Sequence, residues 1–292
     1  KVNDLNVHIE SSADDLVEVI RLCICYDHKS PVLKFHLTMG YMMPKTSPIK
    51  DPFHFHPELR QLIKPFRDSF YRSITTEKIR AQIENSGQEL QIDFYEDDVR
   101  ERLRSEALSQ HTGDLYVFGY ASLMWDPAID FSEVRRAFAP NHQRRFILVD
   151  DKGGRGTSEK PGLMAALDQG QGCEGLAFKI TSEKVDKETE ILFRRELIAP
   201  GYLAVFVPIE IDGTSQVALT FVADHEQPHI RQDITRPEQI RYAATGTGIL
   251  GTSLEYLEST VVQLSEIGII DPAASELLAA ARNYSSPQKA IP

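Results

Sequence analysis

Between residues 115 and 222 the sequence alternates short apolar stretches, rich in β-branched and aromatic residues, with turn signals. Such stretches favour β-strands, and we expect strands over residues 115–120, 145–149, 162–167, 175–180, 202–209 and 217–222. One long helical pattern, at residues 182–198, interrupts the series. A doubly wound sheet would need regular alternation of strands and helices. The pattern therefore predicts an α+β fold built on a small mixed β-barrel with packed helices.

The first 110 residues have a different sequence pattern from residues 115–222. We expect helices in this part over residues 13–25 and 96–109, and over residues 59–83 with a break near Pro65. Residues 31–57 include five prolines, which favours irregular chain with short extended pieces there. We therefore place a domain boundary near residue 110 and predict a mainly helical N-terminal extension, residues 1–110, to which the sequence assigns no role. Residues 111–292 form the predicted barrel domain, and its tail, residues 237–284, is predicted to be helical.

The charge and composition of the chain restrict the kinds of molecule that the protein is expected to bind. The chain has 292 residues and a net charge of −11. Nucleic-acid binding and membrane-surface binding both need a basic face, so the charge argues against either partner. No apolar run approaches the roughly twenty residues needed to cross a bilayer, and the polar N-terminal stretch lacks the hydrophobic region of a signal peptide. Three cysteines form no plausible disulfide framework, so we expect a cytoplasmic protein.

The predicted strand at residues 115–120 runs directly into a tight loop. Gly119 lies near the end of the strand, and a short loop with Ser122, Trp125 and Pro127 follows. A strand that enters such a loop presents several backbone N–H groups in one direction. These groups can hold a carboxylate or a developing oxyanion without a charged side chain. We therefore expect an anion-binding loop at this point.

Glu196 continues an otherwise apolar stripe of the predicted helix, after Val185, Thr189 and Leu192. The stripe is expected to face the barrel, and the last turn of a helix disfavours negative charge. Desolvation and the helix dipole both raise the pKa of a carboxylate toward neutrality, where it can accept and then return a proton. The spacing leaves a second interpretation open, a structural ion pair between Glu196 and Arg155, Arg194 or Arg195.

Five motifs follow one another along the chain from residue 117 onward. They are residues 117–123 with Trp125 and Pro127; Arg155-Gly156-Thr157 with Pro161-Gly162; Cys173-Glu174-Gly175; Arg195-Glu196 with Gly201-Tyr202; and residues 246–272. In this order they resemble the ChaC-like γ-glutamylcyclotransferases, over residues 114 to about 284.

The resemblance implies a γ-glutamylcyclotransferase barrel and the release of 5-oxoproline from a γ-glutamyl substrate. Glutathione is the expected substrate, with Cys-Gly as the second product. Because the α-amine of the substrate attacks its own γ-carbonyl, the resemblance implies no protein nucleophile, no metal and no organic cofactor. Glu196 would be the catalytic base and then the acid. The expected substrate-binding residues are Tyr120, Ala121, Ser122, Leu123, Arg155 and Tyr202.

Several of these assignments have structural alternatives. Tyr120 and Tyr202 are also candidate core aromatics, and Arg155 is also a candidate turn residue. Ala121 departs from the family pattern, which has glycine at this position. If the position required a positive φ, alanine would be costly. We therefore expect either ordinary backbone dihedrals at Ala121 or an altered substrate preference.

Other functions are weaker candidates. Ser122 is not set in the Gly-x-Ser-x-Gly elbow of a hydrolase nucleophile. Cys173 begins a predicted strand, where a small core residue is more common than a thiol nucleophile. The histidines His36, His54 and His56 lack a Cys or carboxylate that would complete a metal site. The main alternative is a non-catalytic binding or regulatory protein that retains the barrel. The sequence leaves the oligomeric state open.

Overall fold

A computed structural model describes residues 3–6, 18–25, 34–41, 51–86 and 93–285. The chain divides into two compact units, Lys1–Lys50 and Asp51–Pro292. In the described part of the first unit, an antiparallel sheet has the order β1-β2-β3, with β1 Asn3–Asn6, β2 Glu18–Cys25 and β3 Lys34–Tyr41.

The helix that we predicted over residues 13–25 is wrong from Glu18 onward, because Glu18–Cys25 is a strand. This strand pairs with β1 on one side and with β3 on the other. Its sequence, EVIRLCIC, is a short and nearly continuous apolar run. Periodicity alone does not separate a buried strand from a helix in such a run, and its isoleucines and valine favour the strand. Residues 13–17 lie outside the described residues.

Short helical elements dominate residues 51–110. They are the 3-10 turns η1 Pro57–Gln61, η2 Phe66–Asp68 and η3 Phe70–Ser73, and the helices α1 Thr76–Ser86 and α2 Asp97–Leu108. The predicted helix at 96–109 is confirmed by α2, whereas the predicted helix at 59–83 is divided into these turns and α1. Leu59 and Ile63 are buried in one apolar cluster with barrel residues such as Leu115 and Phe178. The boundary predicted near residue 110 therefore falls inside the second compact unit.

The second unit is built on a closed β-barrel, which confirms the predicted α+β barrel fold. Within the described residues, five strands pair in the order β4-β8-β5-β9-β10. They are β4 Leu115–Gly119, β8 Cys173–Ile180, β5 Glu133–Ala139, β9 Tyr202–Ile211 and β10 Thr214–Ala223. A parallel pairing of β10 with β4, at Leu219 and Val117, closes the ring. The sheet continues from β10 through β7 Thr157–Gln169 to β6 His142–Lys152.

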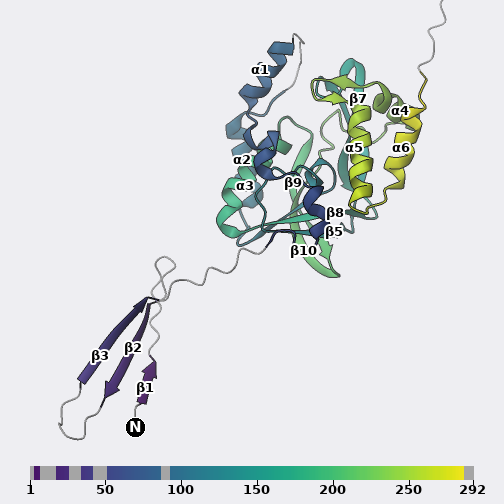
Figure 1. Cartoon of the computed structure of the whole chain (residues 1–292). Helices are drawn as coiled ribbons and strands as arrows, with labels where there is room; N and C mark the ends of the chain where they lie inside the picture. Colours follow the sequence, from purple (N-terminus) through teal and green to yellow (C-terminus); the bar gives the residue numbers. More distant parts are fainter. Residues whose placement is uncertain (1–2, 7–17, 26–33, 42–50, 87–92, 286–292) are drawn as a thin grey trace, which may run out of the picture. The chain divides into compact units, whose positions relative to one another are not determined.

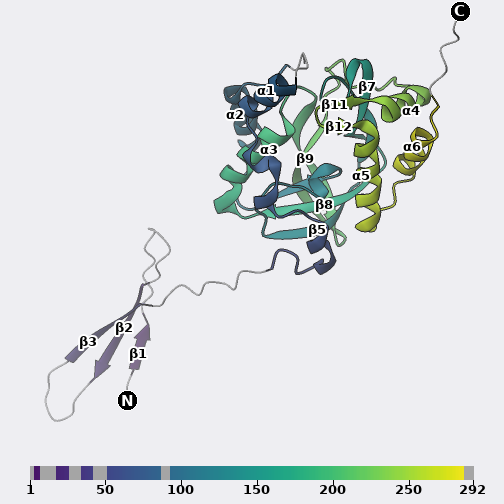
Figure 2. The same cartoon turned by 45° about the horizontal axis from the view of Figure 1, so that its top comes forward.

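Helices cover the barrel from two sides. Figures 1 and 2 show α1, α2 and α3 on one side of the second unit, and α4, α5 and α6 on the other. Their bounds are α3 Val185–Glu196, α4 Arg236–Thr245, α5 Ser253–Glu266 and α6 Pro272–Arg282. The predicted helical tail is thus confirmed. None of the helices that the structure describes is long and apolar enough to cross a bilayer.

The packing of α3 fixes the end of this helix against the barrel. Leu192 and Phe193 are buried, and the Phe193 ring meets Phe221 of β10 edge-on, with the ring centroids 5.4 Å apart. Thr189 and Leu192 are fully buried, as the predicted stripe requires. Burial of such aromatic and aliphatic side chains is worth about 1.5–3 kcal/mol each. The last turn of α3, which carries Glu196, is therefore held by well-packed neighbours.

Candidate active site

The loop after β4 begins with a close backbone approach. A Cβ at Gly119 would lie 2.9 Å from the Cβ of Leu123, so glycine allows the loop to fold back on the strand. Ala121 follows with φ −141°, which is a negative value open to any residue. The replacement of the family glycine by Ala121 therefore carries no left-handed backbone penalty.

The 3-10 turn η4, Ser122–Met124, leaves backbone donors at its start. The amide of Met124 donates to the Ala121 carbonyl at 2.8 Å, and the amide of Trp125 donates to the Ser122 carbonyl at 3.3 Å. The amides of Ser122 and Leu123 precede these donors, and neither donates a hydrogen bond to any residue that the structure describes. Free donors at the start of a turn are the feature that an anion-binding loop requires.

Arg144 of β6 anchors this loop, and sequence reasoning missed it. Its Nε donates to the Tyr120 carbonyl, its Nη2 donates to the Glu174 carbonyl at 2.9 Å, and its Nη1 donates to Asp271. Asp271 also caps α6, because its Oδ1 accepts from the Ala274 amide at 2.9 Å. Arg144 thus joins the loop of the first motif to the Asp-Pro pair that ends the last motif.

Glu196 and Arg195 lie in the last turn of α3, and both side chains are largely buried. The exposed fraction is 12% for the Glu196 side chain and 3% for the Arg195 side chain. Arg195 Nη1 forms an ion pair with Glu196 Oε1, and Arg195 Nη2 donates to Ser122 Oγ at 3.1 Å. The ion pair that the sequence left open is therefore present, with Arg195 as the partner. The same arginine connects Glu196 to the loop after β4.

Two buried atoms of this pair have no hydrogen-bond partner among the described residues. Within the described residues, Glu196 Oε1 and Arg195 Nε are buried and make no contact with hydrogen-bond geometry, although Oε1 lies in ion-pair contact. Burial lowers the pKa of the Arg195 guanidinium, and nearby Tyr71, Asp126 and Tyr256 oppose that shift. An arginine in a protein nevertheless stays charged. The pair therefore offers an acceptor and a charged donor in a nearly dry environment.

Three tyrosines lie near the Arg195–Glu196 pair. Burial raises the pKa of the hydroxyls of Tyr120, Tyr202 and Tyr256, so all three are neutral at neutral pH. The Tyr202 hydroxyl donates to the Ala165 carbonyl at 2.9 Å, and the Tyr256 hydroxyl accepts from the Ala165 amide at 3.3 Å. Tyr256 was not among the predicted site residues, although it lies inside the fifth motif.

Arg155 lies at the edge of the tyrosines rather than beside Glu196. Its guanidinium carbon is 5.0 Å from the centroid of the Tyr256 ring, and its Nη1 donates to the Thr252 carbonyl at 3.3 Å. A Cβ at Gly156 would lie 1.9 Å from the amide nitrogen of Gly162. The Arg-Gly-Thr and Pro-Gly motifs therefore pack backbone against backbone, which requires glycine.

The weaker candidates gain no support from these contacts. Ser122 Oγ accepts from Arg195, and none of the histidine contacts described for the chain involves it. Burial raises the pKa of the Cys173 thiol, which disfavours a thiolate nucleophile. His56 contacts Glu58 and accepts from the Arg136 amide. The described part of the chain contains no group of three or more potential metal ligands that could hold a metal ion.

A hollow in the described surface lies away from these residues. It has a volume of about 430 Å³ and lies between α2 and α3, where Arg104, Leu108, His111 and Val185 line it. None of the predicted site residues lines this hollow.

The chain is similar to several known proteins. A family model described as ChaC-like protein matches residues 115–284. The glutathione-specific gamma-glutamylcyclotransferase of Escherichia coli K12 is 34% identical over 168 residues, which is 57% of this chain and 72% of that protein. Human glutathione-specific gamma-glutamylcyclotransferase 1 is 30% identical over 49% of this chain and 66% of that protein.

A solved structure shares the fold. The crystal structure of a gamma-glutamylcyclotransferase specific to glutathione from yeast aligns with a TM-score of 0.53 and 18% sequence identity. The alignment covers 60% of this chain and 98% of the yeast chain. At this identity the likeness shows the barrel fold, and it covers nearly the whole of the yeast protein.

Proposed function

Because the chain belongs to the family of ChaC-like proteins, we propose that it is a γ-glutamylcyclotransferase that acts on glutathione. In this proposal it is a lyase that converts glutathione into 5-oxoproline and Cys-Gly. The names of the bacterial and human relatives support the substrate. The observation that carries the proposal is the largely buried Glu196 carboxylate, joined through Arg195 to the loop after β4.

The proposed reaction needs no nucleophile from the protein. The α-amine of the γ-glutamyl group loses a proton to Glu196 and attacks the γ-carbonyl, which forms a carbon–nitrogen bond and a tetrahedral oxyanion. The oxyanion then collapses, the bond to the cysteinyl nitrogen breaks, and Glu196 returns its proton to that nitrogen. The proton balance closes without water, metal or redox chemistry. A carboxylate that acts as base and then acid is an established use of general catalysis.

Binding of the substrate is proposed to use the loop of residues 120–123. The free amides of Ser122 and Leu123 are suited to the α-carboxylate or to the oxyanion. The neutral hydroxyls of Tyr120 and Tyr202 can contribute polar contacts without adding charge. Arg155 would meet the substrate from the outer edge of the tyrosines.

Arg195 is proposed to fix the orientation of the base. Its guanidinium contacts Glu196 on one side and Ser122 on the other, so the carboxylate cannot rotate freely. A charged hydrogen bond that holds a catalytic group in a near-attack arrangement can supply a large part of the rate enhancement. We also propose a cytoplasmic location, because the cytosol holds the reduced glutathione pool.

Direct product analysis tests this function. Purified protein is incubated with glutathione, and 5-oxoproline and Cys-Gly are quantified by mass spectrometry. Equal amounts of both products, formed in proportion to the enzyme added, are expected. Other γ-glutamyl dipeptides are assayed in parallel to rank the substrates. If the protein released no 5-oxoproline from any γ-glutamyl substrate, this result would contradict the proposal and favour a binding role.

A further inference from the structure

An aromatic ring from outside the family-matched residues lies against the site. The family match begins at residue 115, and Tyr71 lies in the turn η3, well before it. The guanidinium carbon of Arg195 is 4.6 Å from the centroid of the Tyr71 ring. This distance is typical of a cation–π contact, which is stronger when the cation is desolvated. Tyr71 thus reaches the same arginine that contacts Glu196 and Ser122.

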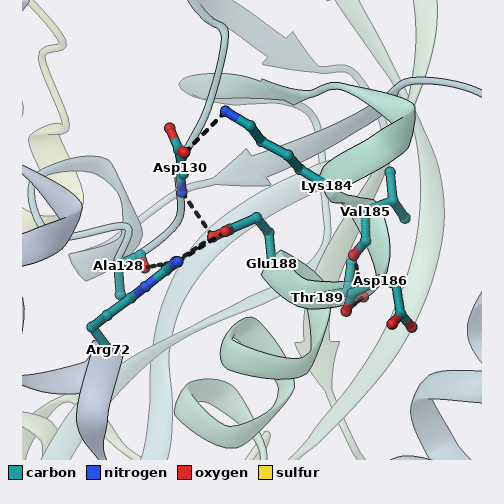
Figure 3. Close-up of polar contacts among 8 residues, drawn as sticks. All are labelled: Arg72, Ala128, Asp130, Lys184, Val185, Asp186, Glu188 and Thr189. Carbon is teal, nitrogen blue, oxygen red and sulfur yellow. Dashed lines mark hydrogen bonds and ion pairs between the residues drawn. The ribbon is translucent and has the colours of Figure 1, made fainter. Parts of the chain in front are cut away.

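The neighbouring residue, Arg72, holds η3 in place. Arg72 Nη2 donates to Glu188 Oε1 at 2.9 Å, and its Nη1 contacts Glu188 Oε2 and donates to the Ala128 carbonyl at 3.1 Å. Figure 3 shows the guanidinium directed at the Glu188 carboxylate, with Ala128 alongside. The Glu188 side chain is 2% exposed and also accepts from the Asp130 amide at 2.8 Å. The arginine therefore ties η3 both to α3 and to the loop after Pro127.

The turn itself is locally ordered. Ser69 Oγ accepts from the Tyr71 amide at 3.2 Å, and the Ser69 carbonyl accepts from the Arg72 amide at 3.2 Å. Arg72 also lies over the Phe66 ring, 4.7 Å from its centroid. With the backbone and Arg72 both held, the Tyr71 ring is presented to Arg195 by a fixed element rather than by a free loop.

We propose that Tyr71 is a positioning residue of the active site, supplied by the chain segment that precedes the family-matched residues. Its ring holds the Arg195 guanidinium, and Arg195 in turn holds the Glu196 carboxylate and the Ser122 hydroxyl. This inference rests on the proposed function. It extends the functional unit at least as far back as η3 and gives residues 51–110 a role in the reaction, for which the sequence offered none.

A matched set of variants tests the proposal. Tyr71→Leu removes the ring face, Tyr71→Phe keeps it, and Phe70→Leu alters the adjacent ring, which is 50% exposed on the same turn. Steady-state kinetics with glutathione are measured at a temperature below the thermal unfolding midpoint of every variant. For Tyr71→Leu we expect a roughly tenfold lower kcat. KM should change little, because the base is disturbed rather than the binding loop.

The conservative variant separates positioning from a structural role. Tyr71→Phe should keep kcat within about twofold of the kcat of the original protein, because a phenylalanine ring also binds a cation. Phe70→Leu should lower kcat far less than Tyr71→Leu does, because the Phe70 ring meets the Tyr71 ring edge-on, with centroids 5.8 Å apart, whereas the Tyr71 ring faces Arg195. Equal kcat for Tyr71→Leu and the unchanged chain would overturn this inference alone. No 5-oxoproline from the unchanged chain would overturn the proposed function, and this inference with it.

Discussion

Arg195 Nη2 donates a hydrogen bond to Ser122 Oγ at 3.1 Å, and this contact joins the end of α3 to the loop after β4. The two residues are 73 positions apart in the chain and belong to different motifs. Because Arg195 also contacts Glu196, the hydrogen bond sets where the carboxylate lies relative to the free amides of the loop.

Arg195 and Arg194 form a matched pair of variants. Arg195 is buried against Glu196 and Ser122, whereas Arg194 forms an ion pair with Glu190 at 3.6 Å across one helical turn. We expect Arg195→Met to lower kcat about a hundredfold, because the base loses its fixed partner. Arg194→Met should lower it less than about twofold, since a partly exposed ion pair between residues four apart on a helix contributes little. Equal losses for the two variants would contradict a special role for Arg195.

Ser122→Ala distinguishes a positioning hydroxyl from a nucleophile. The substitution leaves Arg195 Nη2 without its acceptor, so we expect kcat to fall roughly tenfold, as for loss of a charged hydrogen bond. Loss of a true nucleophile would lower kcat by several orders of magnitude more. Single-turnover assays and intact-protein mass spectrometry during turnover provide the measurement. A covalent adduct at Ser122 would refute the proposed mechanism.

Ala121→Gly restores the residue that the family pattern has at this position. Because φ at Ala121 is −141°, the position does not need the left-handed conformation that favours glycine. The extra freedom of the unfolded chain should lower the free energy of unfolding by about 0.5–1 kcal/mol. Glutathione turnover is expected to stay within about twofold, because the backbone can keep the same path. Chemical denaturation and kcat/KM measure the two effects, and a large gain in kcat/KM would show that Ala121 limits the site.

Local patterns in the sequence predicted much of the barrel but not all of it. Strands whose sequences are mostly apolar, such as residues 115–119 and 202–211, could be predicted. Strand β5, Glu133–Ala139, was missed because Glu133, Arg135 and Arg136 interrupt its apolar residues. The error at Glu18–Cys25 has the opposite cause, since a nearly continuous apolar run fits either a strand or a helix.

The site residues likewise include some that local sequence patterns could predict and some that they could not. Glu196 and residues 120–123 lie within contiguous motifs, so the sequence could nominate them. Arg144 and Arg72 act through contacts with Asp271 and Glu188, which lie 127 and 116 positions away in the chain. No local pattern reports such a contact, because it depends on how the strands and helices pack. The same holds for Tyr71, whose neighbours in the sequence give no sign of Arg195.

The central claim is that the Glu196 carboxylate transfers the proton in the reaction. The direct measurement is 5-oxoproline release from glutathione by Glu196→Gln, with Glu190→Gln, a more exposed residue of the same helix, as the matched control. We expect the kcat of Glu196→Gln to fall at least about a hundredfold. This variant should keep its circular dichroism spectrum and its cooperative unfolding, and the Glu190→Gln control should stay active. Near-normal turnover by folded Glu196→Gln would contradict the account.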